Sequence, residues 1–581
     1  MMNEDGKMKK PKKEDLQSQY SLAKIRNRPD TSEWIETKFE WSENLLKLLR
    51  EKFKFEKFRS KQLAAINATL SKEDVLLLMP TGGGKSLVYQ LPALVNKRLT
   101  LVISPLISLI EDQLIALKNL DIEAATLNSS STKEEKKYVH SSMTSETAKL
   151  NLLYVTPEWV AKSKVFMTYL QKCFDKGYLD RIVIDEVHCC STWGHDFRPE
   201  YNHLGFFKSM FPGVPILGLT ATATMSVLVD IQNMLSLTDA LIITAPFNRP
   251  NLFYKVINKP SDKSDCLDIL EKLLKNKYKN QSGIIYSSTI KECEDLSEGL
   301  KQRGLNVKYY HAQLDSEAKK IIHRRWLQNK YQAVVATIAF GMGIDKPDVR
   351  FVIHHSIPKS MEGLYQESGR AGRDGKQSDC ILMFNLSDFL RNVSMASSKT
   401  EEKNSKSILE YCLDQKRCRR AIIAEHFEDK WNQTDCDKMC DHCKYQREIS
   451  YFNVTSALQD ILNLIVLASN KEIKLTLNKL MSAWFQSGAK ELRNPILKKP
   501  KCSKEQAEHI IGFLIFKGYL NIDKGYTMYT TVAYIQKGQC LNEKATVTMP
   551  YGSNLGYQKV ADIIEIDSEN LEEPSRKRKK D

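Results

Sequence analysis

The sequence comprises 581 residues, of which 42% are hydrophobic and 27% are charged. This length exceeds one ordinary domain and predicts three or four globular domains. No apolar run is long enough to span a membrane, and the polar N-terminal residues lack the apolar core of a secretory signal.

The charge and the cysteines narrow the function classes further. The formal net charge is +15, which favours a polyanionic partner, most often nucleic acid, although solubility would also explain it. Without a secretory signal, the 13 cysteines indicate a reducing compartment, where they are thiols or metal ligands rather than disulfides.

The N-terminal segment, residues 1–40, is polar and basic, and we expect it to be disordered. Over residues 41–245, apolar runs alternate with helical patterns, which predicts a buried parallel sheet in an α/β fold. The predicted strands are Asp74–Met79, Leu99–Ser104, Leu150–Val155, Arg181–Glu186 and Ile216–Ala221.

Residues 245–252 have the character of a linker, and the same α/β pattern restarts after them. The sequence therefore predicts two α/β lobes in tandem, residues 41–245 and 246–394. The predicted strands of the second lobe are Ser282–Ser288, Val307–Ala312, Ala333–Thr337, Arg350–Ser356 and Cys380–Phe384.

The composition changes after the second lobe. Residues 395–450 are predicted to form a cysteine-rich helical subdomain, and residues 451–546 a module of short helices that ends in a β-hairpin. The last segment, 547–581, is polar and is expected to be disordered. Its basic run "SRKRKK" (Ser575–Lys580) fits either a nuclear import signal or a solvated tail.

A glycine-rich stretch, "MPTGGGKS" (Met79–Ser86), follows an apolar strand and opens a predicted helix. Glycines let backbone N–H groups turn inward around phosphates. Lys85 is expected to contact the β/γ-phosphates of ATP, and Ser86 is expected to hold Mg²⁺. The strict phosphate-loop pattern has Gly where this chain has Met79, and a glycine-rich turn with a chance lysine is the alternative. The predicted nucleotide-binding residues of the loop are Thr81, Gly82, Gly83, Gly84, Lys85 and Ser86.

The stretch "IDEVHCCSTWGHDFRPEY" (Ile184–Tyr201) combines adjacent carboxylates, two histidines and two cysteines. It begins at the end of an apolar strand, where doubly wound sheets place ligands. Asp185 is expected to hold Mg²⁺ and Glu186 to orient or activate the attacking water, rather than to form a solvent-exposed acidic pair. Cys189 and Cys190 lack a second cysteine pair nearby, so we interpret them as small, partly buried thiols rather than a zinc or redox site.

In the second lobe, "YQESGRAGRDG" (Tyr365–Gly375) places Arg370 and Arg373 at a predicted helix start. An arginine finger accelerates phosphoryl transfer by about 10³–10⁵. We expect these arginines to act on ATP bound between the two lobes, with Gln366 in the same catalytic group. A basic turn interrupted by glycines is the alternative.

Taken in order, these motifs resemble those of the RecQ DNA helicases of superfamily 2, from Phe55 to about Gly538. The resemblance implies two RecA-like lobes, a zinc-binding subdomain and a winged-helix domain. It also implies that Phe55, Arg59 and Gln62 recognise adenine and that Gly218–Thr224 couples the lobes. Further matching stretches are "KFRSKQ" (Lys57–Gln62), "VISPLISLIEDQ" (Val102–Gln113), "YVTPE" (Tyr154–Glu158), "GLTATAT" (Gly218–Thr224) and "ATIAFGMGIDKPDVR" (Ala336–Arg350).

The same resemblance implies that Ser191–Tyr201 is an aromatic-rich loop that senses single-stranded DNA. Trp193 and Phe197 can stack on unpaired bases at roughly 1–3 kcal/mol each, and Arg198 can contact phosphate or nucleotide. The loop begins five residues after Glu186, so base stacking is expected to act on the water-positioning carboxylate. ATP hydrolysis would then depend on DNA.

Four cysteines follow the second lobe with the spacing Cys-x17-Cys-x3-Cys-x2-Cys, which matches the RecQ zinc-binding subdomain. Four thiolates form a closed, tetrahedral structural Zn²⁺ site, which is expected to hold a helical hairpin against the second lobe. His442 and Cys412 are alternative ligands. The predicted ligands are Cys418, Cys436, Cys440 and Cys443.

Residues Thr455–Gly538 resemble the RecQ winged-helix domain, which implies binding to the duplex near a fork. Its hairpin often carries an aromatic residue that unstacks the terminal base pair. The expected tip is Asp523–Gly525, and Tyr526 is the candidate aromatic, with an ordinary strand residue as the alternative. We expect no HRDC-like domain to follow, as in the short animal members of the family.

The sequence thus predicts an ATP- and Mg²⁺-dependent DNA helicase with structural Zn²⁺, which binds single-stranded and forked duplex DNA and no membrane. By resemblance it moves 3′ to 5′ and acts in DNA repair, recombination or replication in the nucleus. A single-strand DNA-binding protein and a second copy of the chain are candidate partners. An RNA helicase and a non-catalytic DNA-binding or annealing scaffold are the alternatives; Lys85, Asp185, Glu186 and Arg373 argue against the scaffold.

Overall fold

The computed structural model describes residues 32–552, except 148, 192–196, 238, 342, 343, 345, 446–448, 494–498, 527–530 and 540–545. The chain divides into two compact units, Met1–Pro246 and Phe247–Asp581. The two terminal segments that we expected to be disordered lie largely outside the described residues. Where they are described, that expectation is wrong, because Ser32–Ile35 form α2 and Thr548–Gly552 form β17, which pairs with β14 (Ile449–Asn453). No helix in the described ranges is both long enough and apolar enough to cross a membrane.

The described part of the first unit is built on a seven-stranded parallel sheet with the order β3-β4-β2-β5-β6-β1-β7. Its central strands are buried along their whole length, as expected for a sheet covered on both faces by helices. The α/β prediction for this lobe is confirmed. The strands are β1 (Val75–Leu78), β2 (Leu99–Ile103), β3 (Ala124–Leu127), β4 (Leu152–Val155), β5 (Leu179–Ile184), β6 (Ile216–Thr220) and β7 (Leu241–Thr244).

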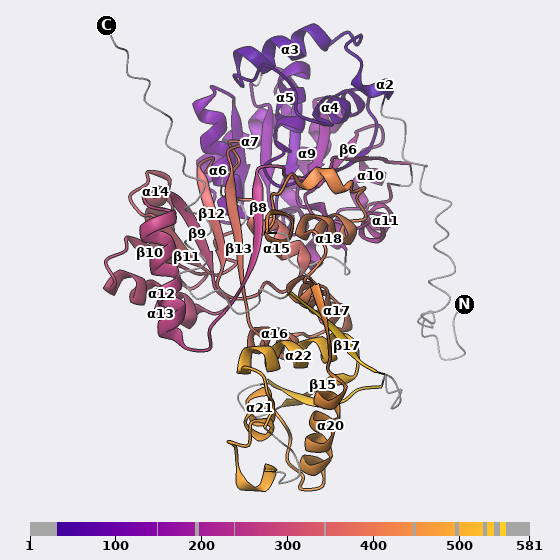
Figure 1. The fold of residues 1–581 in the computed structure, drawn as a ribbon. Coiled ribbons are helices and arrows are strands. Elements are labelled where there is room, and N and C mark those ends of the chain that lie inside the picture. Colours follow the sequence, from indigo (N-terminus) through magenta and orange to yellow (C-terminus); the bar gives the residue numbers. More distant parts are fainter. Residues whose placement is uncertain are drawn as a thin grey trace, which may run out of the picture. The chain divides into compact units, whose positions relative to one another are not determined.

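Helices surround this sheet (Figure 1). Helices α3, α4 and α5 share one hydrophobic core with strands β1 and β6. Helix α5 follows β1 directly in the chain, after a short connecting loop. The α-helices are α2 (Ser32–Ile35), α3 (Ser42–Glu51), α4 (Gln62–Leu70), α5 (Leu87–Asn96), α6 (Ile107–Asn119), α7 (Lys133–Thr144), α8 (Pro157–Lys162), α9 (Lys164–Asp175), α10 (Phe206–Met210) and α11 (Met225–Met234). Two 3₁₀-helices, η2 (Val187–Cys190) and η3 (Pro199–His203), follow β5.

The second unit begins with another lobe, whose described residues form a six-stranded parallel sheet with the order β10-β11-β9-β12-β13-β8. The tandem α/β lobes are therefore confirmed. The strands are β8 (Leu252–Asn258), β9 (Ser282–Tyr286), β10 (Val307–Tyr310), β11 (Ala333–Ala336), β12 (Val349–His354) and β13 (Ser378–Phe384). The helices are α12 (Lys263–Lys272), α13 (Ile290–Gln302), α14 (Ser316–Leu327) and α15 (Met361–Ser368), and the π-helix η4 (Leu273–Lys277) extends α12.

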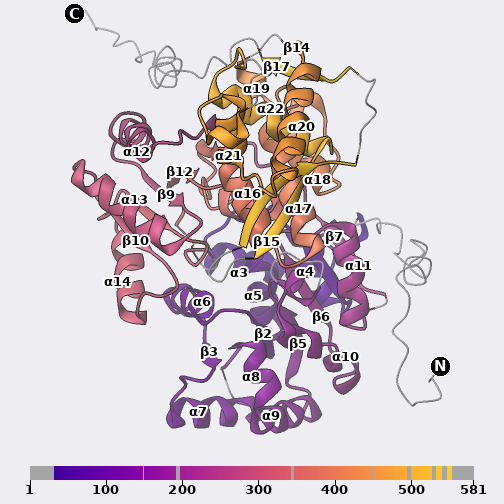
Figure 2. The same cartoon turned by 90° about the horizontal axis from the view of Figure 1, so that it is seen from below.

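A helical region leads from this lobe to the C-terminal module. In Figure 2, α20, α21 and α22 gather into one body beside the β15–β16 hairpin. The helices are α16 (Leu386–Met395), α17 (Lys399–Leu413), α18 (Arg419–His426), α19 (Asp441–Lys444), α20 (Thr455–Ser469), α21 (Leu477–Trp484) and α22 (Lys504–Phe516), with the 3₁₀-helices η5 (Gln433–Cys436) and η6 (Lys490–Leu492). The strands are β14 (Ile449–Asn453), β15 (Leu520–Tyr526), β16 (Thr531–Lys537) and β17 (Thr548–Gly552).

The hairpin corrects one prediction. The expected tip, Asp523–Gly525, lies within β15, where Lys524 pairs with Ala533 and Gly525 with Val532. A Cβ atom at position 525 would overlap the ring of Tyr534, so this glycine serves a close side-chain approach within the ladder rather than a turn. The ladder continues to Tyr526, which pairs with Thr531, and residues 527–530 lie outside the described residues.

Candidate functional site

The predicted phosphate loop connects β1 to α5. Gly82 and Gly84 adopt left-handed backbone conformations, with φ of 79° and 85°, which favour glycine. A Cβ atom at Gly83 would lie 2.6 Å from Cγ of Met79. The Met79 side chain is buried and belongs to the hydrophobic core of the first lobe, which accommodates it where the strict pattern has glycine.

Two of the three residues expected to recognise adenine contact this loop. Gln62, the first residue of α4, donates from Nε2 to the carbonyls of Gly83 (3.3 Å) and Gly84 (3.0 Å). The Arg59 guanidinium donates to the carbonyl of Gly82, and the Arg59 backbone N–H donates to Oε1 of Gln62 at 2.7 Å. Phe55, the third residue, is 47% exposed. Arg59 and Gln62 therefore brace the loop, and their part in adenine recognition stays a prediction.

Lys85 and Ser86 lie where the loop enters α5. Nζ of Lys85 lies 3.5 Å from the carbonyl oxygen of Met79, and Ser86 is the N-cap residue of α5. The N–H groups of Leu87 and Val88 already donate to the carbonyls of Gly84 (3.3 Å) and Lys85 (3.1 Å). What the start of α5 offers to a phosphate group is therefore the positive end of the helix dipole and the ammonium group of Lys85.

The acidic pair follows β5. The backbone N–H of Asp185 donates to the carbonyl of Ile103 at 2.9 Å, and Oδ1 of Asp185 accepts from the N–H of Glu186 at 3.0 Å. Burial, followed by the charge of Glu186, raises the pKa of Asp185 to about 7, and the charge of Lys85 opposes this rise. A half-buried carboxylate pair with this excess of negative charge fits a divalent cation such as Mg²⁺.

His188 connects the acidic pair to the motif at 218–224. Its Nδ1 lies 2.9 Å from Oγ1 of Thr220 and 3.4 Å from Oε2 of Glu186. The backbone carbonyl of Thr220 accepts from the N–H of Met79 at 3.0 Å. Thr220, at the end of β6, therefore contacts both the phosphate loop and the segment that carries the acidic pair.

The described ends of the aromatic loop are attached to the first lobe. Oγ of Ser191 donates to Oδ2 of Asp230, on α11, at 2.5 Å. Arg198 donates from its backbone N–H to the carbonyl of Cys189 at 3.0 Å and from its guanidinium to the carbonyl of Pro105 at 2.9 Å. Both ends of the loop are thus held in place.

Of the predicted stacking residues, Phe197 is 36% exposed, whereas Trp193 lies outside the described residues. Cys189 and Cys190 are fully buried rather than partly buried. Burial raises the pKa of the Cys190 thiol well above its usual range, which makes it unreactive.

The predicted arginine fingers lie just after the end of α15 in the second unit, so their predicted position at a helix start is wrong. Arg370 is buried, with 4% of its surface exposed, and its guanidinium donates to the carbonyl of Gly341. Arg373 is half-buried, and Gln366 lies in the last turn of α15. In the second lobe, Arg370 therefore also holds the segment that contains Gly341.

The four predicted zinc ligands come together. The sulfur atoms of Cys418, Cys436, Cys440 and Cys443 all lie within 4.8 Å of one another. Sγ of Cys418 and Sγ of Cys440 are 3.8 Å apart, which matches the separation of about 3.8 Å that a tetrahedron with Zn–S bonds of about 2.3 Å requires. The thiols of Cys418 and Cys436 hold the pKa of Cys440 well below its usual range. The cluster fits Zn²⁺.

Neither alternative ligand belongs to this cluster. Nδ1 of His442 lies 2.7 Å from the carbonyl of Arg417, and its Nε2 lies 3.0 Å from the guanidinium of Arg419. Cys412 is buried in α17, and burial raises the pKa of its thiol to about 12.

The cluster is attached to strand β8 of the second lobe. The N–H of Tyr254 donates to the carbonyl of Met439 at 3.3 Å, and the N–H of Val256 donates to Oδ2 of Asp441 at 3.2 Å. Arg419 neutralises the buried Asp441 at 3.1 Å. Because β8 is an edge strand of its sheet, the zinc-binding segment also covers part of an edge that would otherwise be open.

In the C-terminal module, Tyr526 is the last residue of β15 and is 83% exposed. The sequence did not indicate the roles of two residues near the predicted sites. Asp230 accepts a hydrogen bond from Ser191 of the aromatic loop, and Lys524 of the hairpin donates to the carbonyl of Ala396. Neither residue belongs to a recognisable motif, so no local signal could have identified them.

Comparison with protein families matches three descriptions along the chain. Residues 59–231 match the DEAD/DEAH box helicase family, residues 265–375 the helicase conserved C-terminal domain, and residues 382–444 the RecQ zinc-binding family. The matches follow the order of the first lobe, the second lobe and the cysteine cluster.

Individual proteins are similar over most of the chain. ATP-dependent DNA helicase Q1 of Mus musculus is 47% identical over 521 residues, which cover 89% of this chain and 80% of the relative. Putative ATP-dependent DNA helicase Q1 of Caenorhabditis elegans is 45% identical, with 89% and 83% covered. ATP-dependent DNA helicase Q-like 2 of Arabidopsis thaliana is 42% identical, with 88% and 71% covered.

Solved structures show the same fold at low sequence identity. The helicase MrfA bound to DNA has a TM-score of 0.51 at 17% identity, over 64% of this chain and 56% of that one. The DEAD-box helicase Mss116 bound to single-stranded RNA has a TM-score of 0.50 at 15% identity, over 68% of this chain and 89% of that one.

Proposed function

Because the chain belongs to the RecQ family of ATP-dependent DNA helicases, we propose that it uses ATP hydrolysis to move 3′ to 5′ along single-stranded DNA and to open the duplex ahead. The chain is an ATP-hydrolysing DNA helicase with a zinc-binding cysteine cluster. The helicase and zinc-binding family matches and the four-cysteine cluster confirm the cofactors predicted from the sequence, ATP with Mg²⁺ and Zn²⁺.

In this proposal, Lys85 and Ser86 bind the phosphates, Asp185 holds the cation with Ser86, and Glu186 orients the attacking water. When bound, ATP supplies the phosphoryl group that is transferred to water, and Mg²⁺ neutralises charge on the phosphates. Arg370 and Arg373, with Gln366, remain the proposed catalytic residues of the second lobe.

One contact carries the proposed dependence of hydrolysis on DNA. The hydroxyl of Tyr201, at the end of the aromatic loop, donates to the backbone carbonyl of Asp185 at 3.0 Å. A displacement of the loop on base stacking would therefore reach the backbone of the cation-binding carboxylate. Trp193, Phe197 and Arg198 are the proposed DNA contacts of this loop.

We further propose that the winged-helix module binds the duplex near a fork and that Tyr526 separates the strands. The exposed position of Tyr526 at the end of β15 supports this role. A nuclear location rests on the basic run Ser575–Lys580, outside the described residues. The proposed partners are a single-strand DNA-binding protein and a second copy of the chain, with repair, recombination or replication as the setting.

The test is steady-state ATP hydrolysis without nucleic acid, with single-stranded DNA and with single-stranded RNA, beside a Lys85→Ala control. Duplexes with a 3′ or a 5′ single-stranded tail then report direction. Stimulation by DNA and unwinding of the 3′-tailed substrate, both absent in Lys85→Ala, are the expected results. Stimulation by RNA in place of DNA, or unwinding only from the 5′ tail, would overturn the proposal.

A further inference from the structure

Lys524 extends from the β15–β16 hairpin to the corner between α16 and α17. Its Nζ donates to the backbone carbonyl of Ala396 at 2.7 Å and forms an ion pair with Oε1 of Glu402 at 2.6 Å. The side chain is 17% exposed, so it is largely enclosed at this corner. Ala396 is the C-cap residue of α16, where unpaired carbonyls and the helix dipole favour a positive charge.

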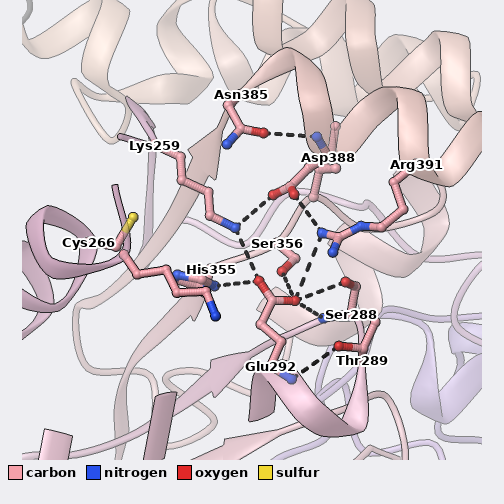
Figure 3. A network of polar contacts seen from close by, with 12 residues as sticks. Lys259, Cys266, Ser288, Thr289, Glu292, His355, Ser356, Asn385, Asp388 and Arg391 are labelled. Carbon is pink, nitrogen blue, oxygen red and sulfur yellow. Dashed lines mark hydrogen bonds and ion pairs between the residues drawn. The ribbon is translucent and has the colours of Figure 1, made fainter. Parts of the chain in front are cut away.

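The other end of α16 is fixed to the second lobe by a network of buried charges (Figure 3). Oδ2 of Asp388 lies 2.8 Å from Nζ of Lys259, and Oδ1 of Asp388 lies 2.5 Å from the guanidinium of Arg391. Nζ of Lys259 also pairs with Oε1 of Glu292 at 3.2 Å. Because buried charges are costly to separate from their partners, α16 is held firmly to the strand ends that carry this network.

Glu292 extends the network to the carboxyl edge of the sheet in the second lobe. Its Oε2 accepts hydrogen bonds from the hydroxyls of Ser288, after β9, at 3.0 Å and Ser356, after β12, at 2.9 Å. On α16, Nδ2 of Asn392 donates to the carbonyls of Ile357 (3.1 Å) and Pro358 (3.2 Å). Helix α16 is therefore connected to segments that follow two neighbouring strands.

The body of the winged-helix module rests on the same two helices. A Cβ atom at Gly512, on α22, would lie 3.4 Å from both Cδ1 of Leu386 on α16 and Cδ2 of Leu413 on α17. This close approach fixes α22. The hairpin is also packed on the module away from its end: strand β16 lies against α16, and the N–H of the buried Ile535 donates to the carbonyl of Leu475 at 2.8 Å. A two-stranded hairpin is only marginally stable by itself. An exposed residue at its end therefore needs a nearby anchor if it is to keep its position when it contacts the duplex.

Lys524 lies two residues before Tyr526 in β15, on the same face of the strand and about 7 Å along it. We propose that Lys524 is a positioning residue that makes the end of the hairpin one rigid body with the second lobe, through α16. The inference rests on the proposed unwinding function: it specifies how a movement of the second lobe would be delivered to Tyr526 rather than lost in bending of the hairpin.

The test compares Lys524→Met with Lys524→Arg in the full chain. A matched control is Lys517→Met, which removes the same charge from an exposed position at the end of α22. Each variant is assayed for unwinding of a forked duplex, for DNA-stimulated ATP hydrolysis and for hydrogen–deuterium exchange of residues 520–526. We expect Lys524→Met to slow unwinding by about tenfold, because small misplacements of a working group have effects of this size, and to retain hydrolysis within about twofold.

Exchange of residues 520–526 is expected to rise in Lys524→Met, whereas Lys524→Arg and Lys517→Met resemble the parent protein. Equal loss of hydrolysis and unwinding in Lys524→Met, or normal unwinding with raised exchange, would overturn the positioning role. A parent protein that hydrolyses ATP without unwinding any fork would overturn the proposed function as well. Raised exchange in Lys524→Met would then still establish the anchor.

Discussion

Nδ1 of His188 and Oγ1 of Thr220 lie 2.9 Å apart, so a buried imidazole connects the acidic pair after β5 with the end of β6. The same threonine accepts the backbone N–H of Met79 through its carbonyl, at the start of the phosphate loop. Thr220, within Gly218–Thr224, therefore contacts both the predicted phosphate loop and the segment that carries the acidic pair.

The first prediction concerns Thr220. Thr220→Val keeps the shape of the side chain but removes the hydroxyl that faces His188. We expect DNA-stimulated hydrolysis to fall about tenfold while ATP affinity changes little, because the backbone contact to Met79 stays. Steady-state kinetics and a nucleotide-binding assay measure the two effects. Ser226→Ala, at an exposed position in α11, is the control, and an unchanged hydrolysis rate in Thr220→Val would contradict the coupling role.

The second prediction concerns the support of the aromatic loop. Asp230→Ala removes the acceptor of the 2.5 Å hydrogen bond from Ser191, which weakens the attachment of the first end of the loop. Stimulation of hydrolysis by single-stranded DNA should fall roughly fivefold, with the rate in the absence of DNA preserved, since Asp230 makes no contact with the acidic pair in the described structure. Titration of DNA in the hydrolysis assay separates the two rates. Equal loss of both would indicate that Asp230 supports the lobe as a whole.

The third prediction concerns the zinc cluster. Cys440→Ser removes the most buried ligand and should release zinc and unfold the segment attached to β8, at a cost of several kcal/mol. Metal content by atomic absorption and a thermal melt measure the loss. Cys502→Ser, outside the cluster, is the matched control and should retain zinc. The prediction would be wrong if the Cys440→Ser protein were folded, soluble and free of zinc.

The fourth prediction concerns Tyr526. Tyr526→Ala removes an 83% exposed ring and should not change stability, because the ring is not part of the core. Unwinding of a forked duplex should slow about tenfold, since one stacking contact is worth roughly 1–3 kcal/mol, while DNA-stimulated hydrolysis continues. Tyr451→Ala, on β14 and 63% exposed, is the control for loss of a surface aromatic. If both variants unwind like the parent protein, another residue separates the strands.

The predictions made from local patterns agree with the structure in specific ways. Continuous apolar runs identified five strands of each lobe. Strands β3 and β7 of the first lobe and β8 of the second lobe were not among them. Strand β3 has partly exposed residues, so its apolar signal is weak. The cysteine spacing led directly to a cluster whose sulfur atoms lie within 4.8 Å. Such signals work because strand burial and metal ligation restrict residue types at fixed, short spacings.

The hairpin shows where a local pattern fails. The residues Asp523–Gly525 have the composition of a turn, yet they pair with β16 because the register is set by side-chain packing across the two strands. Gly525 accommodates the ring of Tyr534, a neighbour nine positions away. The residues of β15 alone do not indicate that Gly525 will lie against Tyr534 on the partner strand.

By itself, the sequence determined the lobes, the nucleotide-binding motif, the acidic pair and the four zinc ligands, since each depends on residues close together in the chain. Only the tertiary structure decided which distant residues support them. Asp230 lies 39 positions from Ser191, and Lys524 lies 128 positions from Ala396. Such contacts form when packed elements bring side chains together. The local sequence around a single charged or polar residue does not identify its partner in the folded protein.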